Sequence, residues 1–290
     1  MIFVERKLKY LVISFSLLMG ILIFSSIFLN GEYIPLMPYL VPLNQRTNNL
    51  FALGIMVVIV PLSIIEFNNN RWLKAVDKHI PRLLMDVTES IRSGLSLFNA
   101  LEVAATRDYG PITKELESAM VNFRITSDFE GSMKYLGERL KRPNAKRLVT
   151  ILMETYETGG RIDDILDTSI DMFTAIDEYK EERDSQIGPY VLLVYIGALI
   201  FLIISWTIVT QFVQPVIDVS QQEHVAESGI LTNVLDINYY ISILFWASLI
   251  EGLVGGLVAG KIVHGRISGG LIHSVFLLVM SLIFFNTLIR

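Results

Sequence analysis

Five long apolar stretches, separated by polar segments, recur along this 290-residue chain. They are Leu11–Leu29, Leu50–Ile65, Pro189–Val213, Tyr239–Ala259 and Gly270–Ile289. Because a helix needs roughly 20 apolar residues to cross the hydrocarbon core of a bilayer, each stretch predicts a membrane-spanning helix. Pro61 predicts a kink in the second one. The first is longer than the apolar core of a secretory signal, and no small-residue cleavage pattern follows it, so we expect a retained anchor.

A polar insert, residues 68–187, lies between the second and third apolar stretches and carries 17 of the 24 basic and 21 of the 29 acidic residues. Its apolar residues recur at helical spacing, for example between Leu83 and Ile91. Helix boundaries are indicated by glycines suited to carboxyl-terminal caps, prolines suited to first turns and one capping box: Gly94, Gly110, Pro111, Pro143 and Ser127–Glu130. The insert therefore predicts a bundle of about six short helices. The whole chain predicts an all-α, polytopic membrane protein.

We expect three regions: an N-terminal membrane hairpin (1–67), the helical insert (68–187) and a C-terminal membrane region (188–290). Orientation follows from the short flanks of the spans, because Lys and Arg accumulate on the cytoplasmic side. Basic residues precede the first span, and Lys261 and Arg266 lie between the fourth and fifth. The Gln214–Asn238 loop has four acidic residues and no Lys or Arg. This pattern predicts a cytoplasmic N-terminus and insert, and a C-terminus outside the cell.

Composition and motifs exclude several functions. The chain is 52% hydrophobic with a formal net charge of -5, which argues against a general nucleic-acid binder. It has no cysteine, which excludes disulfides, thiol catalysis and cysteine-based zinc sites. The four histidines lack metal-ligand spacing, and Gly255–Ile262 lacks the Ser or Thr that a P-loop needs after its lysine. We therefore expect no catalytic residue, no cofactor and no metal, and we do not expect an enzyme.

Small residues recur every four positions in the fourth predicted span, at Ser248, Gly252, Gly256 and Gly260. Such a face lets helix backbones approach closely in lipid. Its partner could be the third span, the fifth span or a second copy of the chain. Glu251 borders this face near the middle of the span. An intramembrane carboxylate either marks a functional site or is a protonated or paired structural residue.

Several runs of the insert, taken together, resemble the cytoplasmic domain of the type II secretion F and type IV pilus platform family. They are Ile80–Leu84, Ser93–Leu101, Tyr109–Thr113 and Glu157–Leu166, the last followed by a charged helix and a span opening at Tyr190. The similarity extends over roughly residues 71–213. It looks closest to the archaeal pilus and archaellum branch and to the tight-adherence relatives.

This resemblance implies an integral membrane platform that is not an enzyme. In that family the helical domain meets a hexameric cytosolic secretion ATPase, and the membrane part passes pilin subunits from the bilayer into a growing filament. Archaeal members commonly carry two such domains, whereas this chain has one. The resemblance therefore also implies a homodimer or a pairing with a related platform protein.

Two sets of candidate residues follow from the resemblance. The family's turns and a recurrent acidic position match Gly94, Glu157, Gly159 and Gly160, for which simple helix caps and a structural hydrogen bond are the alternatives. The candidate contact with the ATPase consists of basic residues: Arg139, Lys141, Arg142, Lys146, Arg147, Lys261 and Arg266. A solvated helix surface is the alternative for this cluster.

Two other functions stay open at this point. A transporter or channel subunit would account for Glu251, Pro61 and the small-residue face, but it predicts more polar residues inside the spans. A membrane-tethered signalling adaptor would account for the helical insert, but the sequence carries no phosphotransfer or nucleotide motif.

Overall fold

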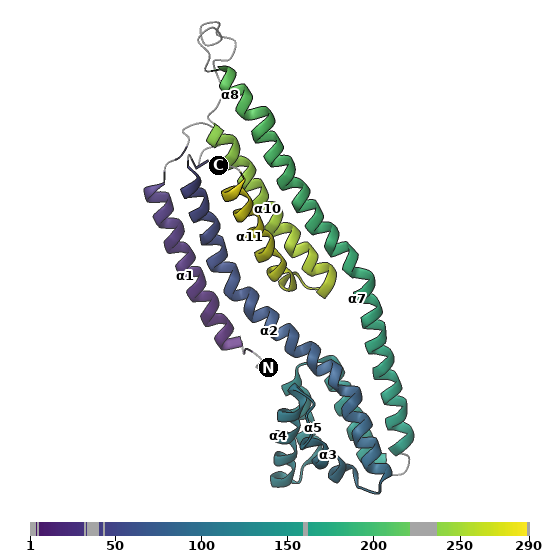
Figure 1. Cartoon of the computed structure of the whole chain (residues 1–290). Coiled ribbons are helices and arrows are strands. Elements are labelled where there is room, and N and C mark those ends of the chain that lie inside the picture. Colours follow the sequence, from purple (N-terminus) through teal and green to yellow (C-terminus); the bar gives the residue numbers. More distant parts are fainter. Residues whose placement is uncertain are drawn as a thin grey trace. The chain divides into compact units, whose positions relative to one another are not determined.

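The computed structural model describes residues 4, 6–31, 33, 41–42, 44–158, 162–220 and 237–288. Within these ranges the chain forms helices and one isolated bridge between Tyr33 and Pro42, with no strand, which confirms the all-α prediction (Figure 1). The helices are α1 (Arg6–Asn30), α2 (Gln45–Arg92), α3 (Leu97–Ala105), α4 (Pro111–Thr126), α5 (Phe129–Leu140), α6 (Pro143–Thr158), α7 (Ile162–Thr207), the π-helix η1 (Ile208–Val213), α8 (Gln214–Ser220), α10 (Ile237–His264), the 3-10 helix η2 (Ile267–Gly270) and α11 (Leu271–Thr287).

Five helical segments are long and apolar enough to cross a membrane. The five segments are Lys7–Asn30 in α1, Gln45–Arg92 in α2, Asp164–Val219 from α7 to α8, Ile237–His264 in α10 and Ile267–Thr287 in η2 and α11. They confirm the predicted set of five spans. The chain is therefore a multi-pass membrane protein. α2 passes through Pro61 and α7 passes through Pro189 without ending.

The described residues divide into two compact units. The insert unit consists of residues 68–186, and the membrane unit consists of residues 4–67 and 187–288. The insert unit contains the six expected helical segments, but only α3 to α6 are short separate helices. The first and last segments are parts of the 48-residue α2 and the 46-residue α7.

The capping residues at the start of α4 and at the junction of α4 and α5 differ from the sequence interpretation. Gly110 lies at the N-cap of α4, with φ 59°, and does not close α3. Ser127 closes α4 in the left-handed region, and Asp128 is the N-cap of α5, where its side chain accepts a hydrogen bond from the Gly131 amide at 2.9 Å. An Asp at an N-cap satisfies an amide that the helix itself cannot pair, so it performs the capping expected of Ser127.

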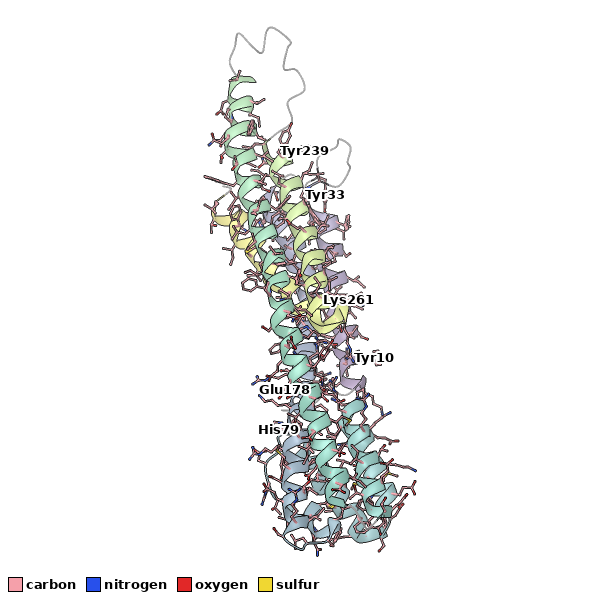
Figure 2. All side chains as sticks on the ribbon, turned by 90° about the vertical axis from the view of Figure 1, so that its right-hand side faces the viewer. Tyr10, Tyr33, His79, Glu178, Tyr239 and Lys261 are labelled. Carbon is pink, nitrogen blue, oxygen red and sulfur yellow. The ribbon has the colours of Figure 1, made fainter. Side chains whose placement is uncertain are left out.

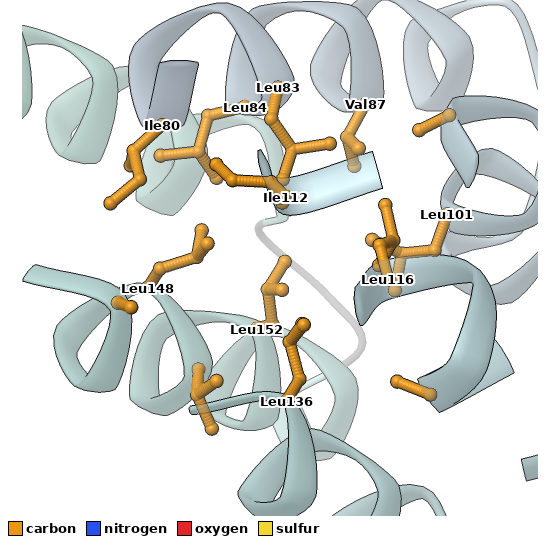
Figure 3. Packing of buried hydrophobic residues seen from close by; sticks show 14 of the residues in the cluster. Ile80, Leu83, Leu84, Val87, Leu101, Ile112, Leu116, Leu136, Leu148 and Leu152 are labelled. Carbon is orange, nitrogen blue, oxygen red and sulfur yellow. The ribbon is translucent and has the colours of Figure 1, made fainter. Parts of the chain in front are cut away.

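The insert unit closes around one aliphatic core, to which each of its helices contributes. Figure 3 shows side chains of α2, α3, α4, α5 and α6 meeting there: Ile80, Leu83, Leu84, Val87, Leu101, Ile112, Leu116, Leu136, Leu148 and Leu152. All ten are fully buried. Leu166 and Phe173 of α7 complete the cluster. Burial of these stripes removes apolar surface from water and holds the four short helices together.

Tyrosines mark both ends of the membrane unit. Figure 2 shows Tyr33 and Tyr239 at one end of this unit, and Tyr10 and Lys261 towards the other. Tyrosine is favoured where bilayer meets water, because its ring is apolar and its hydroxyl is polar. This distribution supports the assignment of α1 and α10 as membrane-spanning helices.

Candidate functional site

Arg142, one residue of the basic cluster predicted as a partner contact, lies between α5 and α6. It is paired with a carboxylate inside the insert unit. Its guanidinium forms an ion pair with Asp77 of α2, whose side chain is only 6% exposed. Lys180 of α7 binds the same carboxylate oxygen, with Nζ 3.1 Å from Oδ2. Burial alone would raise the pKa of the Asp77 carboxyl, but the hydrogen bonds and charges of Arg142 and Lys180 hold that pKa below its ordinary value. Asp77 therefore joins Arg142, at the start of α6, and Lys180 of α7 to α2.

Arg139, near the end of α5, is also engaged inside the insert unit. Its guanidinium donates two hydrogen bonds to Glu115 of α4, from Nε at 2.8 Å and from a terminal nitrogen at 3.2 Å. A two-point pair of this kind fixes the orientation of both side chains. Arg139 therefore crosslinks α4 and α5, although 45% of its side chain stays exposed.

Lys146 and Arg147 lie near the start of α6 and differ from the two arginines above. Both are exposed, and neither makes an ion pair within the described part of the chain. Lys141 is exposed as well and closes α5 in the left-handed region, with φ 55°. A helix N-terminus carries a partial positive charge, so two cations beside it are electrostatically unfavourable for the isolated domain. Of the predicted cluster, Lys146 and Arg147 have the charges most available to a partner.

Lys261 and Arg266 belong to the membrane unit. Lys261 is exposed in the last turn of α10, and Arg266 is the exposed residue before η2. Nearby, Glu66 of α2 accepts hydrogen bonds from Lys9 of α1 at 2.9 Å and from Ser268 of η2 at 2.7 Å. This carboxylate joins three segments of the membrane unit next to Arg266.

Two of the four family-motif positions, Gly94 and Glu157, lie within the described residues, at the ends of helices. Gly94 follows α2 with φ 94°, a conformation that L-residues with a side chain rarely adopt. Glu157 is exposed in the last turn of α6 and has no hydrogen-bond partner within the described residues. Gly159 and Gly160 lie outside the described residues.

The Tyr109–Thr113 motif has a clear structural role. Tyr109 is fully buried, and its hydroxyl donates to Asp86 of α2 at 2.5 Å. Asp86 also pairs with Arg107 at 3.0 Å. Burial and the Asp86 carboxylate raise the pKa of the Tyr109 phenol. This motif therefore anchors the turn before α4 to α2.

The small-residue face of α10 packs against η2 and α11. Gly252 approaches α11 so closely that a Cβ built on it would lie 3.2 Å from the Leu277 Cβ. A Cβ on Gly256 would overlap the backbone of Ser274, and one on Gly260 would overlap the backbone of Gly270. Ser274 adds a hydrogen bond from its hydroxyl to the Leu253 carbonyl of α10, at 2.8 Å. Of the three partners left open by the sequence, the structure places the fifth span on this face.

Glu251 lies one residue away from this face and is half-buried in α10. No residue in the described ranges gives its carboxylate a hydrogen bond or an ion pair. Within the described residues, Glu251 therefore has no paired structural role.

Sequence reasoning did not find Asp77 and Glu115, the carboxylates that pair with the two arginines, or Lys180, which shares Asp77 with Arg142. One signal was available for Asp77. It lies between Leu73 and Ile80 on the apolar stripe of α2, where a charged residue needs a buried partner. The identity of that partner depends on a contact 65 residues away, which periodicity does not reveal.

Comparison with known proteins relates this geometry to a family. Residues 83–210 match the family model described as type II secretion system (T2SS), protein F. A curated protein of Methanocaldococcus jannaschii, named only as uncharacterised, is 25% identical over 236 residues, which are 80% of this chain and 37% of that relative. The chain thus spans little more than a third of the length of this relative. No solved structure matches the chain.

Proposed function

Since residues 83–210 form a domain of the type II secretion system protein F family, as the sequence resemblance predicted, we propose that the chain is the membrane platform of a type IV pilus-like or secretion machine. In this role it couples a cytosolic hexameric ATPase to the insertion of pilin subunits into a filament. The observation that carries the proposal is the matched domain in a chain with five candidate spans. The archaeal relative is consistent with the archaeal branch of the family.

The proposed orientation places the N-terminus and the insert unit in the cytoplasm and the C-terminus outside. It rests on the basic flanks of the spans and on the acidic segment Gln214–Asn238, which the sequence predicted as a loop and whose first residues form α8. Because the chain has no cysteine, single cysteines report on it without background. An impermeant maleimide should label Asp218→Cys but not Glu117→Cys in intact cells, and both after lysis. Labelling of Glu117→Cys alone in intact cells would reverse the orientation.

The proposed ATPase contact is centred on Lys146 and Arg147. The insert has 17 basic and 21 acidic residues, a net charge of -4, so an exposed basic pair stands out locally. These two cations have no internal partner in the described residues and lie beside the positive end of α6, so an acidic partner surface would relieve their repulsion. The predicted cluster also contains Lys141, Arg139 and Arg142, but Arg139 and Arg142 are paired with carboxylates of the insert unit. Lys261 and Arg266 form a second basic surface in the membrane unit.

The experiment is a pull-down of a hexameric secretion ATPase from the same organism, using the purified full-length protein in detergent micelles. The variant Lys146→Glu/Arg147→Glu should lose ATPase binding by at least tenfold. It should stay folded, because acidic residues near a helix N-terminus favour the helix. Binding by the unaltered protein should weaken as salt shortens the Debye length below about 8 Å.

The matched control is Arg124→Glu/Lys134→Glu, which makes the same change in net charge on α4 and α5. Arg124 pairs with Glu102 and Lys134 with Glu130, and pairs of this kind near the surface contribute little to stability. The control should bind the ATPase as the unaltered protein does. Equal loss in both variants would make the contact a matter of net charge, and full binding by Lys146→Glu/Arg147→Glu would remove this surface from the proposal.

Two further parts of the proposal concern organisation. We propose that the three sequence regions, 1–67, 68–187 and 188–290, act as a membrane hairpin, a platform domain and a C-terminal membrane region. We also propose that a second platform subunit, either another copy or a related protein, completes the assembly. In support, the matched segment fills only 37% of the archaeal relative, which leaves that relative room for more than one such segment.

A further inference from the structure

The membrane unit contains a cavity of about 530 Å³ where the start of α2, the start of α10 and the end of α11 come together. Its polar lining includes Gln45, Arg46, Asn49 and Asn286, and its apolar lining includes Leu50 and Phe285. This volume falls within the range of about 300–1,000 Å³ that is typical of small-ligand sites. None of the residues assigned above to the ATPase contact lines this cavity.

The amide groups of the cavity form a chain of hydrogen bonds with a defined direction. The Leu282 carbonyl can only accept, so the Asn286 amide nitrogen that lies 2.7 Å away must donate to it. The same nitrogen donates to Asn49 Oδ1 at 3.0 Å, and Asn49 Nδ2 donates back to Asn286 Oδ1 at 2.7 Å. Gln45 Nε2 then donates to Asn49 Oδ1 at 3.4 Å. These constraints fix which end of each amide is oxygen.

The chain leaves one acceptor unused. Gln45 Oε1 is buried and has no donor within the described residues. A buried acceptor without a partner costs about 1–3 kcal/mol. Within the described residues the Gln45 amide makes one long bond of 3.4 Å and Gln45 lines the cavity, so a turn of the amide would let its oxygen accept a hydrogen bond from a ligand. A ligand with a hydroxyl donor would satisfy this oxygen.

Arg46 gives the cavity its charge. It is exposed, it makes no ion pair among the described residues, and no acidic residue is found among the described residues that line the cavity. A guanidinium binds phosphate oxygens through a planar set of donors. The ligand chemistry that fits is a phosphate ester that also carries hydroxyl groups.

The position of the cavity indicates where such a ligand comes from. Leu50 is the first residue of the apolar stretch of α2 and is 41% exposed. Phe285 is fully buried in the last turn of α11. The polar residues Gln45, Arg46 and Asn49 lie directly before this apolar stretch, at the level where a span leaves the hydrocarbon core. A phosphate with acyl chains would place its headgroup against the polar lining and its chains along the exposed apolar side.

We propose that this cavity binds the headgroup of an anionic phospholipid with free hydroxyl groups, such as a phosphatidylglycerol, with Arg46 on the phosphate and Gln45 on a hydroxyl. The site fixes a lipid at the junction of α2, α10 and α11. It does not rest on the ATPase contact, so its failure would leave the platform proposal unchanged.

The test is the thermal midpoint of the full-length protein in neutral detergent micelles with one added lipid at a time. Phosphatidylglycerol should raise the midpoint most. Phosphatidylethanol, which is anionic but has no hydroxyl donor, should bind about fivefold more weakly, as expected for one hydrogen bond. Phosphatidylcholine should have the smallest effect. Soluble glycerol phosphate should have no effect at the same concentration, because it lacks the acyl chains.

Two variants separate the contributions. Arg46→Gln should weaken phosphatidylglycerol binding about tenfold, as expected for the loss of a charged hydrogen-bond donor. Gln45→Leu should keep binding but lose the preference for phosphatidylglycerol over phosphatidylethanol. Lys261→Gln is the control, since it removes one exposed positive charge at the opposite end of α10 and should change neither preference.

Three results would overturn the proposal. Equal effects of phosphatidylglycerol and phosphatidylcholine on the unaltered protein would show that the cavity does not recognise an anionic headgroup. Equal phosphatidylglycerol binding by Arg46→Gln and the unaltered protein would show that Arg46 does not bind the phosphate. A shift with glycerol phosphate as large as with phosphatidylglycerol would make the ligand a soluble phosphate ester and not a lipid.

Discussion

The insert unit and the membrane unit differ in which side chains they bury and which they expose. In the insert unit, Leu83 and Leu136 are fully buried. In the membrane unit, Leu11, Ile21 and Leu193 are 62 to 65% exposed. The comparison shows that the same chain is built for two solvents: water around the insert unit and lipid around the membrane unit.

The contacts inside each unit differ for the same reason. The insert unit gains stability by moving aliphatic surface out of water, and its exposed side chains form ion pairs across helices, as Arg139 does with Glu115. In lipid there is no such gain, so α10 depends on close backbone approach to α11 at Gly256 and to η2 at Gly260. Buried hydroxyl and amide groups add to this, as where Asn48 Nδ2 donates to Ser242 Oγ at 2.8 Å.

The largest effect is expected from a bulky residue on the small-residue face. In Gly260→Leu the new side chain would overlap the Gly270 backbone, which cannot move aside as a flexible side chain would. We expect a loss of about 4 kcal/mol or more, or failure to assemble. The measurement is the monodisperse yield and thermal midpoint in detergent.

Gly197→Leu is the control for this change, because a Cβ on Gly197 would meet nothing within 4 Å. Gly20 is unsuitable, because a Cβ there would lie 2.5 Å from the Val58 side chain. Similar yields for Gly260→Leu and Gly197→Leu would show that the close approach of α10 to η2 is not required.

The next effect concerns the aliphatic core of the insert unit. Leu116→Ala removes a fully buried side chain from α4 and should cost about 2–5 kcal/mol, through lost burial and the cavity left behind. Val121→Ala on the same helix is the control, because Val121 is 44% exposed. Thermal unfolding in detergent should separate the two variants, and equal midpoints would contradict the assigned core.

A smaller effect is expected from Asp77→Asn, which leaves Arg142 and Lys180 without their carboxylate. We expect a loss of about 2 kcal/mol at neutral pH, since hydrogen bonds to charged groups contribute about 1.5–3 kcal/mol. The folded-state pKa of Asp77 is lowered, so its contribution is complete above the unfolded pKa of about 4 and disappears as pH falls through the folded value. The stability difference from the unaltered protein should therefore shrink in acid, and a difference that grows in acid would refute the pairing.

The smallest effect is expected at Ile125, which is 79% exposed at the end of α4. Ile125→Ser should change the free energy of unfolding by less than about 0.5 kcal/mol, because an exposed side chain outside the core contributes little. A loss comparable to that of Leu116→Ala would mean that Ile125 is covered by a partner or by another part of the chain.

The sequence predicted the elements better than their contacts. The five spans follow from apolar length, and Pro111 and Pro143 begin helices as expected because proline fits a first helical turn. The continuity of α2 across the insert boundary was missed, because the change from apolar to polar residues at Phe67 alters the solvent without breaking the helix. Composition reports the solvent of a segment, whereas helix ends depend on local capping.

The candidate sites were less predictable, because they depend on residues far apart in the chain. The basic cluster was visible as a local run, but Asp77 pairs with both Arg142 and Lys180, which lie 65 and 103 residues away along the chain. The cavity near Arg46 likewise combines residues 45–50 with residues 285–286. Short-range patterns contain no information on such pairings.

The most direct test of the account is whether exposed residues of the two units meet different solvents. Leu193 is 62% exposed in the membrane unit, and Glu117 is exposed in the insert unit. In membrane vesicles with the cytoplasmic face outward, a water-soluble maleimide should label Glu117→Cys rapidly and leave Leu193→Cys unlabelled until the protein is unfolded. Equal labelling of both cysteines in intact vesicles would contradict the account of a water-exposed domain joined to lipid-embedded helices.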